Sequence, residues 1–133
     1  MTEAEVRAFV VRYFHAALEE TDLDIFANLY TEDGVLEDPV GTPPLRGRAA
    51  IREFLRRGRG LIARTNVTVR EVMVCGDESA VRWSVEMHTI QGASMTHEGI
   101  GIFTFAGPGQ LRHVKEYYDA SRLVELFSRA AAG

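Results

Sequence analysis

Val35-Leu36-Glu37-Asp38-Pro39-Val40-Gly41-Thr42-Pro43-Pro44-Leu45-Arg46-Gly47-Arg48 is the most informative stretch of this chain. It predicts a strand over 34–40, a rigid turn built on proline and glycine, and a helix that begins at Gly47. Alternate side chains of a strand point to opposite faces, so Leu36, Asp38 and Val40 share one face of it. Asp38 is therefore a carboxylate placed among apolar side chains.

This placement of Asp38 suits a general base. Burial disfavours the ionised form of a carboxyl group and raises its pKa, and a base that works near neutral pH needs a pKa in that region. The alternative is structural: an aspartate at the end of a strand can cap the turn at Pro39.

The same residues resemble the segment that carries the catalytic base in bacterial ketosteroid isomerases, and more broadly the SnoaL-like and nuclear transport factor 2-like superfamily. The matching pattern is Glu37-Asp38-Pro39-x-Gly-x-Pro43-Pro44-x-x-Gly47-Arg48. Further matches at Arg12-Tyr13, Leu29-Tyr30 and Glu116-Tyr117-Tyr118-Asp119 extend the resemblance over most of the chain. The motifs are specific for a fold that hosts isomerases, cyclases, dehydratases, epoxide-opening enzymes and non-enzymes.

Length and composition indicate one soluble domain over residues 1–133, with 46% hydrophobic and 26% charged residues. The net charge of −4 argues against nucleic acid as a general partner. A lone cysteine, Cys75, excludes an internal disulfide and fits a reducing compartment; we expect it to be buried in a strand. Neither a signal peptide nor an apolar run of membrane-spanning length is visible, so we expect a cytoplasmic protein.

The order of elements predicts an α+β fold. A capping box at Thr2 opens a helix that runs to about residue 20. Helices are also expected over 22–30 and 47–59, with a final helical turn or two over 120–131. Strands are expected over 34–40, 66–75, 79–90, 95–105 and 110–119, with glycine-rich turns between the later ones. Three helices then pack on the concave face of one curved antiparallel sheet. The resemblance implies a cone-shaped pocket between them.

Alternation within the strands assigns side chains to faces, and the resemblance implies which face points into the pocket. The inward set would be mostly apolar and aromatic, with Asp38, His97 and Glu116 as its few ionisable groups. Such a pocket suits a flat, lipophilic small molecule, although large aromatic side chains on strands are also ordinary core. The expected substrate-binding residues are Tyr30, Leu55, Trp83, Val85, His97, Gly101, Phe103 and Tyr118.

Carried over residue by residue, the resemblance implies that Asp38 is the base and that Tyr13 donates to the substrate oxyanion, with Tyr30 in support. Two family positions differ. The protonated acid of the oxyanion hole falls on Gly101, and a tyrosine that supports the oxyanion tyrosine falls on Leu55. Loss of one oxyanion donor typically costs a factor of about 10²–10³ in rate.

Glu116 is a candidate for a catalytic acid. It lies two residues before Tyr118 on the same predicted face, next to the strand that holds Gly101. A glutamic acid kept neutral by an apolar pocket can donate to an oxyanion or protonate a leaving oxygen. The alternative is an ion pair with an arginine at the rim of the pocket. Glu71 is a second possible partner of Asp38.

Other polar residues carry weaker signals. His97 either titrates inside the pocket or lies exposed at a strand end. The seven arginines between Arg46 and Arg64 either mark an anionic ligand, such as an acyl carrier or coenzyme A thioester, or form a solvated face. No spacing typical of a metal site and no phosphate or dinucleotide motif is present, so no cofactor is expected.

Three functions remain open. The leading one is a cofactor-independent acid/base enzyme acting on a lipophilic small molecule, similar to a steroid Δ-isomerase, with Asp38, Tyr13 and Glu116 as catalytic residues. A polyketide cyclase or epoxide-opening enzyme using Asp38 with Glu116 is the first alternative. A non-catalytic binder of hydrophobic ligands is the second; a structural module has only the fold in its favour. The resemblance also implies a homodimer that covers apolar residues such as Ile90, Ile100 and Ile102.

Overall fold

The computed structural model describes residues 1–132, and side chains as far as residue 128. Its helices are α1 (Glu3–Leu18), α2 (Leu23–Ala27), α3 (Arg48–Gly58) and α4 (Ala120–Ala132). Its strands are β1 (Tyr30–Glu37), β2 (Leu45–Arg46), β3 (Ile62–Cys75), β4 (Glu78–Thr89), β5 (Ser94–Gly107) and β6 (Gln110–Tyr117).

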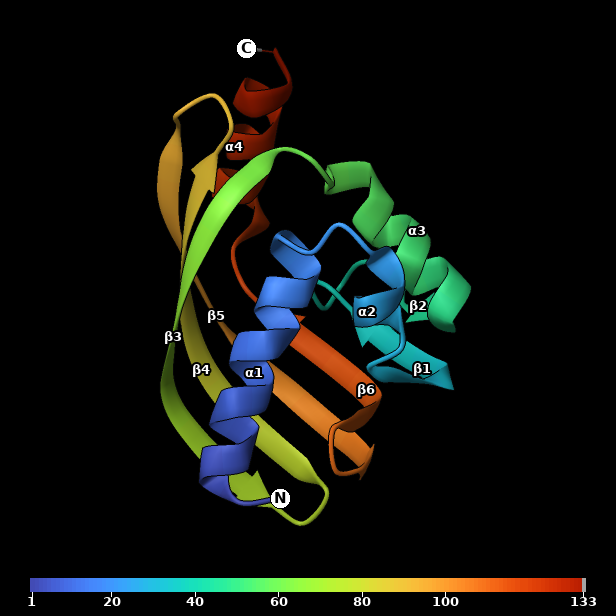
Figure 1. Ribbon diagram of the computed structural model, residues 1–133. Helices are drawn as coiled ribbons and strands as arrows, with labels where there is room; N and C mark the ends of the chain where they lie inside the picture. Colours follow the sequence, from blue (N-terminus) through green and yellow to red (C-terminus); the bar gives the residue numbers. More distant parts are fainter. Residues whose placement is uncertain (133) are drawn as a thin grey trace.

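The six strands form one curved sheet in the order β2-β1-β6-β5-β4-β3. Helices α1, α2 and α3 lie on one side of it, and α4 stands at one end of the molecule (Figure 1). The predicted α+β class is confirmed. One strand pairing differs from expectation, because β1 runs parallel to β6 while the other neighbours are antiparallel.

Local differences from the predicted elements have tertiary causes. The helix expected over 22–30 ends early at Ala27, and Tyr30 already pairs with Leu111 of β6. The short strand β2 pairs Leu45 and Arg46 with β1 inside the segment expected to be a turn. Pairing with a neighbouring strand satisfies backbone groups that local sequence alone leaves undetermined.

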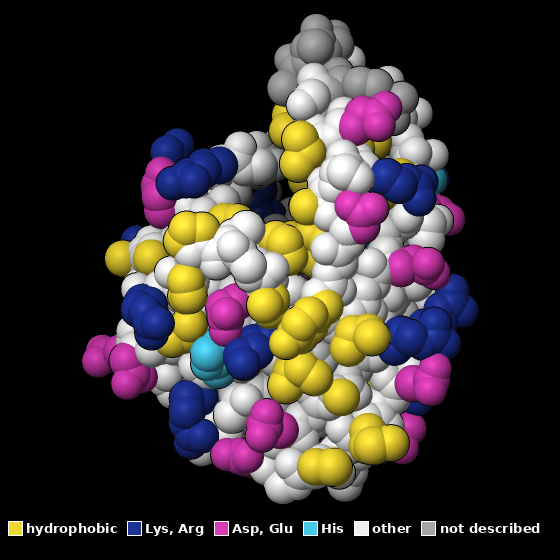
Figure 2. Space-filling view, turned by 180° about the vertical axis from the view of Figure 1, so that it is seen from behind, with side chains coloured by type: hydrophobic (Ala, Val, Ile, Leu, Met, Phe, Trp, Pro, Cys, Tyr) yellow, Lys and Arg dark blue, Asp and Glu magenta, His cyan; other side chains and the backbone are white. Residues whose placement is uncertain are grey.

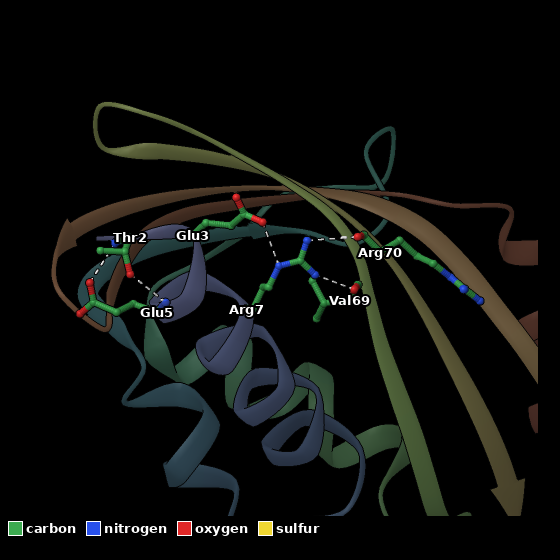
Figure 3. Close-up of polar contacts among 6 residues, drawn as sticks. All are labelled: Thr2, Glu3, Glu5, Arg7, Val69 and Arg70. Carbon is green, nitrogen blue, oxygen red and sulfur yellow. Dashed lines mark hydrogen bonds and ion pairs between the residues drawn. The ribbon is translucent and has the colours of Figure 1, made fainter.

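The predicted capping box at the start of α1 is confirmed. The Thr2 side chain accepts from the Glu5 backbone N–H, and the Glu5 side chain accepts from the Thr2 N–H. One turn later, Arg7 extends across to β3 (Figure 3). Its guanidinium donates to the carbonyl oxygens of Val69 and Arg70 at 2.9 and 3.2 Å.

The Arg7 contact falls where β3 bends. The pairing of β3 with β4 shifts register between Val69 and Glu71, the mark of a β-bulge. A bulge leaves backbone carbonyls outside the regular ladder, and the guanidinium supplies donors for two of them. Arg7 therefore fastens α1 to the sheet at the point where the sheet curves around it.

The core lies between α1 and the concave face of the sheet. Helix α1 contributes Val6, Phe9 and Val10, which are fully buried, together with Tyr13 and Phe14. These pack against inward-facing side chains of the central strands: Val81, Trp83, Val85, Phe103, Phe105 and Val114. Aromatic rings meet edge to face or tilted within this cluster, with Tyr13 and Phe103 centroids 5.2 Å apart.

The outer face of the sheet is partly apolar. Figure 2 shows hydrophobic side chains gathered on this side. Ile100 and Tyr117 lie on the adjacent strands β5 and β6, Met73 lies on the edge strand β3, and each is at least 45% exposed. The prediction that Cys75 is buried is wrong: it ends β3 and is exposed, because the alternation of this long strand turns it outward.

A search of the described helices finds none that combines the length and the apolar character needed to cross a bilayer.

Candidate active site

A cavity of about 510 Å³ lies between the sheet and the helices. Asp38, Glu116, His97 and Tyr118 line one part of it, and most of the remaining wall is apolar. Figure 2 shows the molecule hollowed between α4 and the lobe that carries α3. The other lining residues are Tyr13, Phe14, Ala17, Leu18, Phe26, Pro39, Thr42, Phe54, Leu55, Arg57, Gly58, Arg59, Leu61, Ile62, Trp83, Met87, Ala120, Leu123, Val124 and Phe127.

The parallel pairing of β1 with β6 brings Asp38 into this cavity. Glu37 is in register with Lys115, so the residues that follow each of them emerge side by side at the same end of the sheet. The Val40 N–H donates to the Glu116 carbonyl at 2.9 Å and holds the two segments together. Asp38 and Glu116, almost 80 positions apart in sequence, thus face one cavity.

Asp38 accepts a short hydrogen bond on Oδ1 from the Tyr118 hydroxyl. Burial raises the pKa of Asp38 to about 6, and the hydrogen bond from Tyr118 acts in the opposite direction. At neutral pH the carboxylate is therefore mostly ionised but only weakly stabilised, which is the state of an effective base.

Glu116 is only 2% exposed. Burial raises the pKa of Glu116 well above its usual range, the nearby charge of Asp38 adds to this, and the Trp83 indole acts in the other direction. Glu116 Oε1 and Trp83 Nε1 are both buried without a hydrogen bond of normal geometry. Burial thus favours the neutral carboxylic acid form of Glu116, and its Oε1 has no hydrogen-bond partner within the protein.

Gly101 makes room for this carboxyl group. Gly101 and Glu116 are opposite each other in the pairing of β5 with β6. A Cβ atom built on Gly101 would overlap Oε1 of Glu116 and approach the Phe103 ring to 2.6 Å. The space that a side chain at position 101 would occupy is therefore filled by a carboxyl group from the neighbouring strand.

Tyr13 and Tyr30 form a pair beside the carboxyl groups, with their hydroxyl oxygens 2.5 Å apart. Burial raises the pKa of both phenols well above the usual value, so both stay protonated. Tyr13 lines the cavity and Tyr30 lies behind it. If Tyr30 donates to Tyr13, the Tyr13 proton is free to point at a ligand.

His97 is a buried, neutral imidazole, not an exposed strand-end residue. It is 5% exposed, and burial, with a smaller effect of the Arg122 charge, lowers the pKa of His97 to about 4. Its ring meets Tyr118 edge to face, with centroids 4.5 Å apart. His97 therefore adds a polar but uncharged group to the wall of the cavity.

The structure separates the predicted site residues into two layers. Leu55, Trp83, His97 and Tyr118 line the cavity directly. Four others lie outside the lining: Tyr30, Val85, Gly101 and Phe103, all buried. Glu71 is not a partner of Asp38, because it is exposed and pairs with Arg82 at 2.8 Å.

Sequence reasoning missed two parts of the cavity. Helix α4 contributes Leu123, Val124 and Phe127, and the end of α3 with the following loop contributes Arg57 and Arg59. The apolar stripe of α4 was visible in the sequence, but nothing local showed what it would cover. Within the described part of the chain, no group of three or more His, Cys, Asp or Glu side chains could hold a metal ion.

Comparison with known proteins relates this chain to a family and to a curated relative. Residues 10–114 match the family model of the SnoaL-like domain. The chain is also 34% identical over 122 residues to a steroid Δ-isomerase from Nocardioides simplex, a match that covers 91% of this chain and 95% of the relative.

Proposed function

Because the chain belongs to the SnoaL-like family, in the ketosteroid isomerase-like branch of the nuclear transport factor 2-like superfamily, we propose that it is a cofactor-independent isomerase. The substrate is a lipophilic ketone, and a Δ5-3-ketosteroid is the first candidate, since the relative is a steroid Δ-isomerase. One observation carries the proposal: Asp38 and Glu116 line the same cavity, and their pKa values are raised to different extents.

Unequal environments give two carboxyl groups separate roles. Asp38, mostly ionised at neutral pH, takes a proton from the carbon next to the ketone. The oxygen that becomes an enolate accepts hydrogen bonds from the protonated Glu116 and from Tyr13. Protonated Asp38 then returns the proton to the far carbon of the double bond, which gives a conjugated enone. This division of labour between an aspartate base and a neutral acid is the known pattern of ketosteroid isomerase.

The carboxyl group of Glu116 supports this reaction despite the glycine at position 101. In the family pattern the acid of the oxyanion hole would extend from position 101. Here Glu116 fills that space from the opposite strand. Because position 55 holds leucine, one tyrosine that supports the oxyanion tyrosine in the family pattern is absent. The other support is kept, since Tyr30 is hydrogen-bonded to Tyr13.

The first experiment follows conjugated-enone formation by absorbance with a Δ5-3-ketosteroid, and binding with an equilenin-like phenol. Wild type should turn over. Asp38→Asn should bind the phenol but lose at least about 10³-fold in rate, the upper range expected for loss of a general base. Glu37→Gln is the matched control, because Glu37 points to the other face and pairs with His113 at 2.6 Å. Binding without turnover in wild type would contradict the isomerase and favour a non-catalytic binder.

A second arm tests the acid. Glu116→Ala should lower turnover about 10²–10³-fold, as for loss of an oxyanion donor. The double variant Gly101→Asp with Glu116→Ala places an acid on the other strand, in space that Glu116 vacates, and should recover part of that loss. An unchanged rate in Glu116→Ala would exclude the proposed role of Glu116.

A second candidate reaction uses the same two groups. A buried neutral acid opposite an ionised base can also serve ring closure of a polyketide or opening of an epoxide. Such an enzyme would depend on Asp38 and Glu116 without accepting the ketosteroid. We further propose that the protein is a cytoplasmic homodimer, since its single cysteine is free and the outer sheet face is partly apolar.

A further inference from the structure

Five of the seven arginines between Arg46 and Arg64 fall into two groups in the structure, and Arg46 and Arg64 are exposed. Three of the five are used internally. Arg48 donates to the Tyr30 carbonyl at 2.9 Å, Arg52 pairs with Asp24 at 2.7 Å, and Arg56 pairs with Glu53 at 2.6 Å. Arg57 and Arg59 instead line the cavity.

Arg59 is incompletely satisfied. Its Nη2 donates to the Ala16 carbonyl at 3.2 Å, in the last turn of α1. Its Nε and Nη1 are buried and have no hydrogen-bond partner. Burial lowers the pKa of Arg59, and the charge of Glu20 only partly offsets this. Unpaired guanidinium donors beside a cavity are costly unless something else supplies the acceptor.

No carboxylate of the described chain forms an ion pair with either arginine. Glu20 affects Arg59 only through a longer-range charge interaction, and the two side chains form no ion pair. Glu53 pairs with Arg56, three residues further along α3, and interacts with the charge of Arg57 only at longer range. Arg57 is exposed and lines the cavity. Two positive charges therefore line the cavity without an ion-pair partner among the residues described.

The two arginines and the carboxyl groups lie at different levels of the cavity. Glu116 is level with Gly101 and, through it, with Val81 of β4. Ile62, which follows the arginines, is level with Thr89 of β4, eight residues further along that strand. The Arg59 side chain reaches back from this end to the Ala16 carbonyl, about one turn of α1 beyond Tyr13. Between the two levels the cavity wall is largely apolar, with Leu18, Leu61, Met87 and Phe127.

We infer that the substrate carries an anionic group, a carboxylate or a sulfate, at the end remote from its reacting ketone, and that Arg59 and Arg57 bind it. The inference rests on the proposed function for the reacting end, while the anion site rests on the arginines alone. A planar or tetrahedral oxyanion supplies several acceptors and matches the fork of a guanidinium. The apolar middle of the cavity accommodates the hydrocarbon body between the two polar ends.

Calorimetric binding to Asp38→Asn protein tests this without any turnover. Two matched pairs of ligands are used: 3-oxochol-4-en-24-oate with its methyl ester, and testosterone sulfate with testosterone. At least one anion should bind about tenfold or more tighter than its neutral partner, the range of a hydrogen bond to a charged group. The pair that shows the difference identifies carboxylate or sulfate. The preference should weaken as salt is added.

Variants assign the preference to the arginines. Arg59→Gln should remove most of it and leave the affinity for the neutral ligand unchanged. Because Arg59 also bonds to Ala16, Arg57→Gln is the second variant; it should reduce the preference without affecting thermal unfolding. Arg56→Gln is the matched control, since Arg56 pairs with Glu53 on the same helix and does not line the cavity.

Equal binding of both members in both pairs, no binding of any ligand, or a preference that survives both arginine variants would each overturn the inference. Turnover is measured separately on wild type. An arginine-dependent anion preference without turnover would contradict the isomerase and leave the anion site standing. Turnover of neutral ketosteroids with no anion preference would support the isomerase and overturn the anion site.

Discussion

Asp38 is a buried carboxyl group whose ionisation lowers the stability of the folded protein at neutral pH. Its pKa rises from 3.8 to about 6 on folding, so the folded protein binds the proton more tightly than the unfolded chain. The stabilisation this provides is complete below pH 3.8 and is lost as pH rises through about 6. At neutral pH the side chain is ionised. By linkage, the free energy of unfolding is then roughly 3 kcal/mol lower than it would be with Asp38 protonated.

Replacing the charge should therefore stabilise the protein. We expect Asp38→Asn, which keeps an acceptor for Tyr118, to raise the free energy of unfolding at pH 7–8 by up to roughly 3 kcal/mol. The difference from wild type should shrink as pH falls toward 4. Denaturant unfolding across pH measures it, with Glu37→Gln as the control. A variant that is less stable than wild type at pH 8 would contradict this account.

Under the proposed function, Tyr118 is a positioning residue for the base Asp38. Its hydroxyl donates to Asp38 and lowers the pKa that burial raises. In Tyr118→Phe this contribution is lost, so the acid limb of the kcat/KM profile, expected near pH 6 in wild type, should move to higher pH. The ring contact with His97 is kept. The pH–rate profile is the measurement, and a limb that stays in place would show that Tyr118 only packs.

At the level of elements, long strands and helices could be predicted because their periodicity spans many residues. The capping box of α1 and strands β4, β5 and β6 follow directly from local pattern. The parallel pairing of β1 with β6 could not be predicted, because it depends on contacts between segments about 80 residues apart. That pairing is what places Asp38 beside Glu116.

The contact between α1 and the bend of β3 should contribute measurably to stability. Arg7→Met removes the donors to the Val69 and Arg70 carbonyls. We expect a loss of about 1–2 kcal/mol in the free energy of unfolding, because Arg7 is partly exposed and water can replace part of the contact. Glu3→Gln, which removes only the surface ion pair with Arg7, should cost under about 0.5 kcal/mol. Equal effects of the two variants would count against a role at the bulge.

At the scale of the whole molecule, the outer face of the sheet is the surface that needs cover. Ile100 and Tyr117 are in register on β5 and β6 and are 46% and 45% exposed. If two copies pair through this face, Ile100→Asp should convert a dimer to a monomer in light scattering at micromolar concentration. Thr68→Asp, on the edge strand β3, is the control. A monomeric wild type would contradict the homodimer.

The site as a whole was only partly predictable. The sequence and its resemblance named Asp38, Tyr13, Glu116, Trp83 and Tyr118, which line the cavity, while the roles assigned to these residues stay predictions. They did not reveal that Tyr118 donates to Asp38 or that Arg57 and Arg59 reach the cavity. These contacts join residues that are distant in sequence, so neither hydrophobic periodicity nor charge spacing contains them. Likewise, the exposure of Cys75 depends on how a long strand turns at its end.

Gly101 and Glu116 also bear on how such proteins should be compared with one another. The resemblance places an acid of the family pattern at position 101, where this chain has glycine, and the Glu116 carboxyl group from the adjacent strand occupies that space. Under the proposed function, the acid of the oxyanion hole is therefore supplied from across a strand pairing. A search for this chemistry among distant relatives should therefore compare the contents of the cavity, since matching residue for residue would discard chains that keep the same group on another strand.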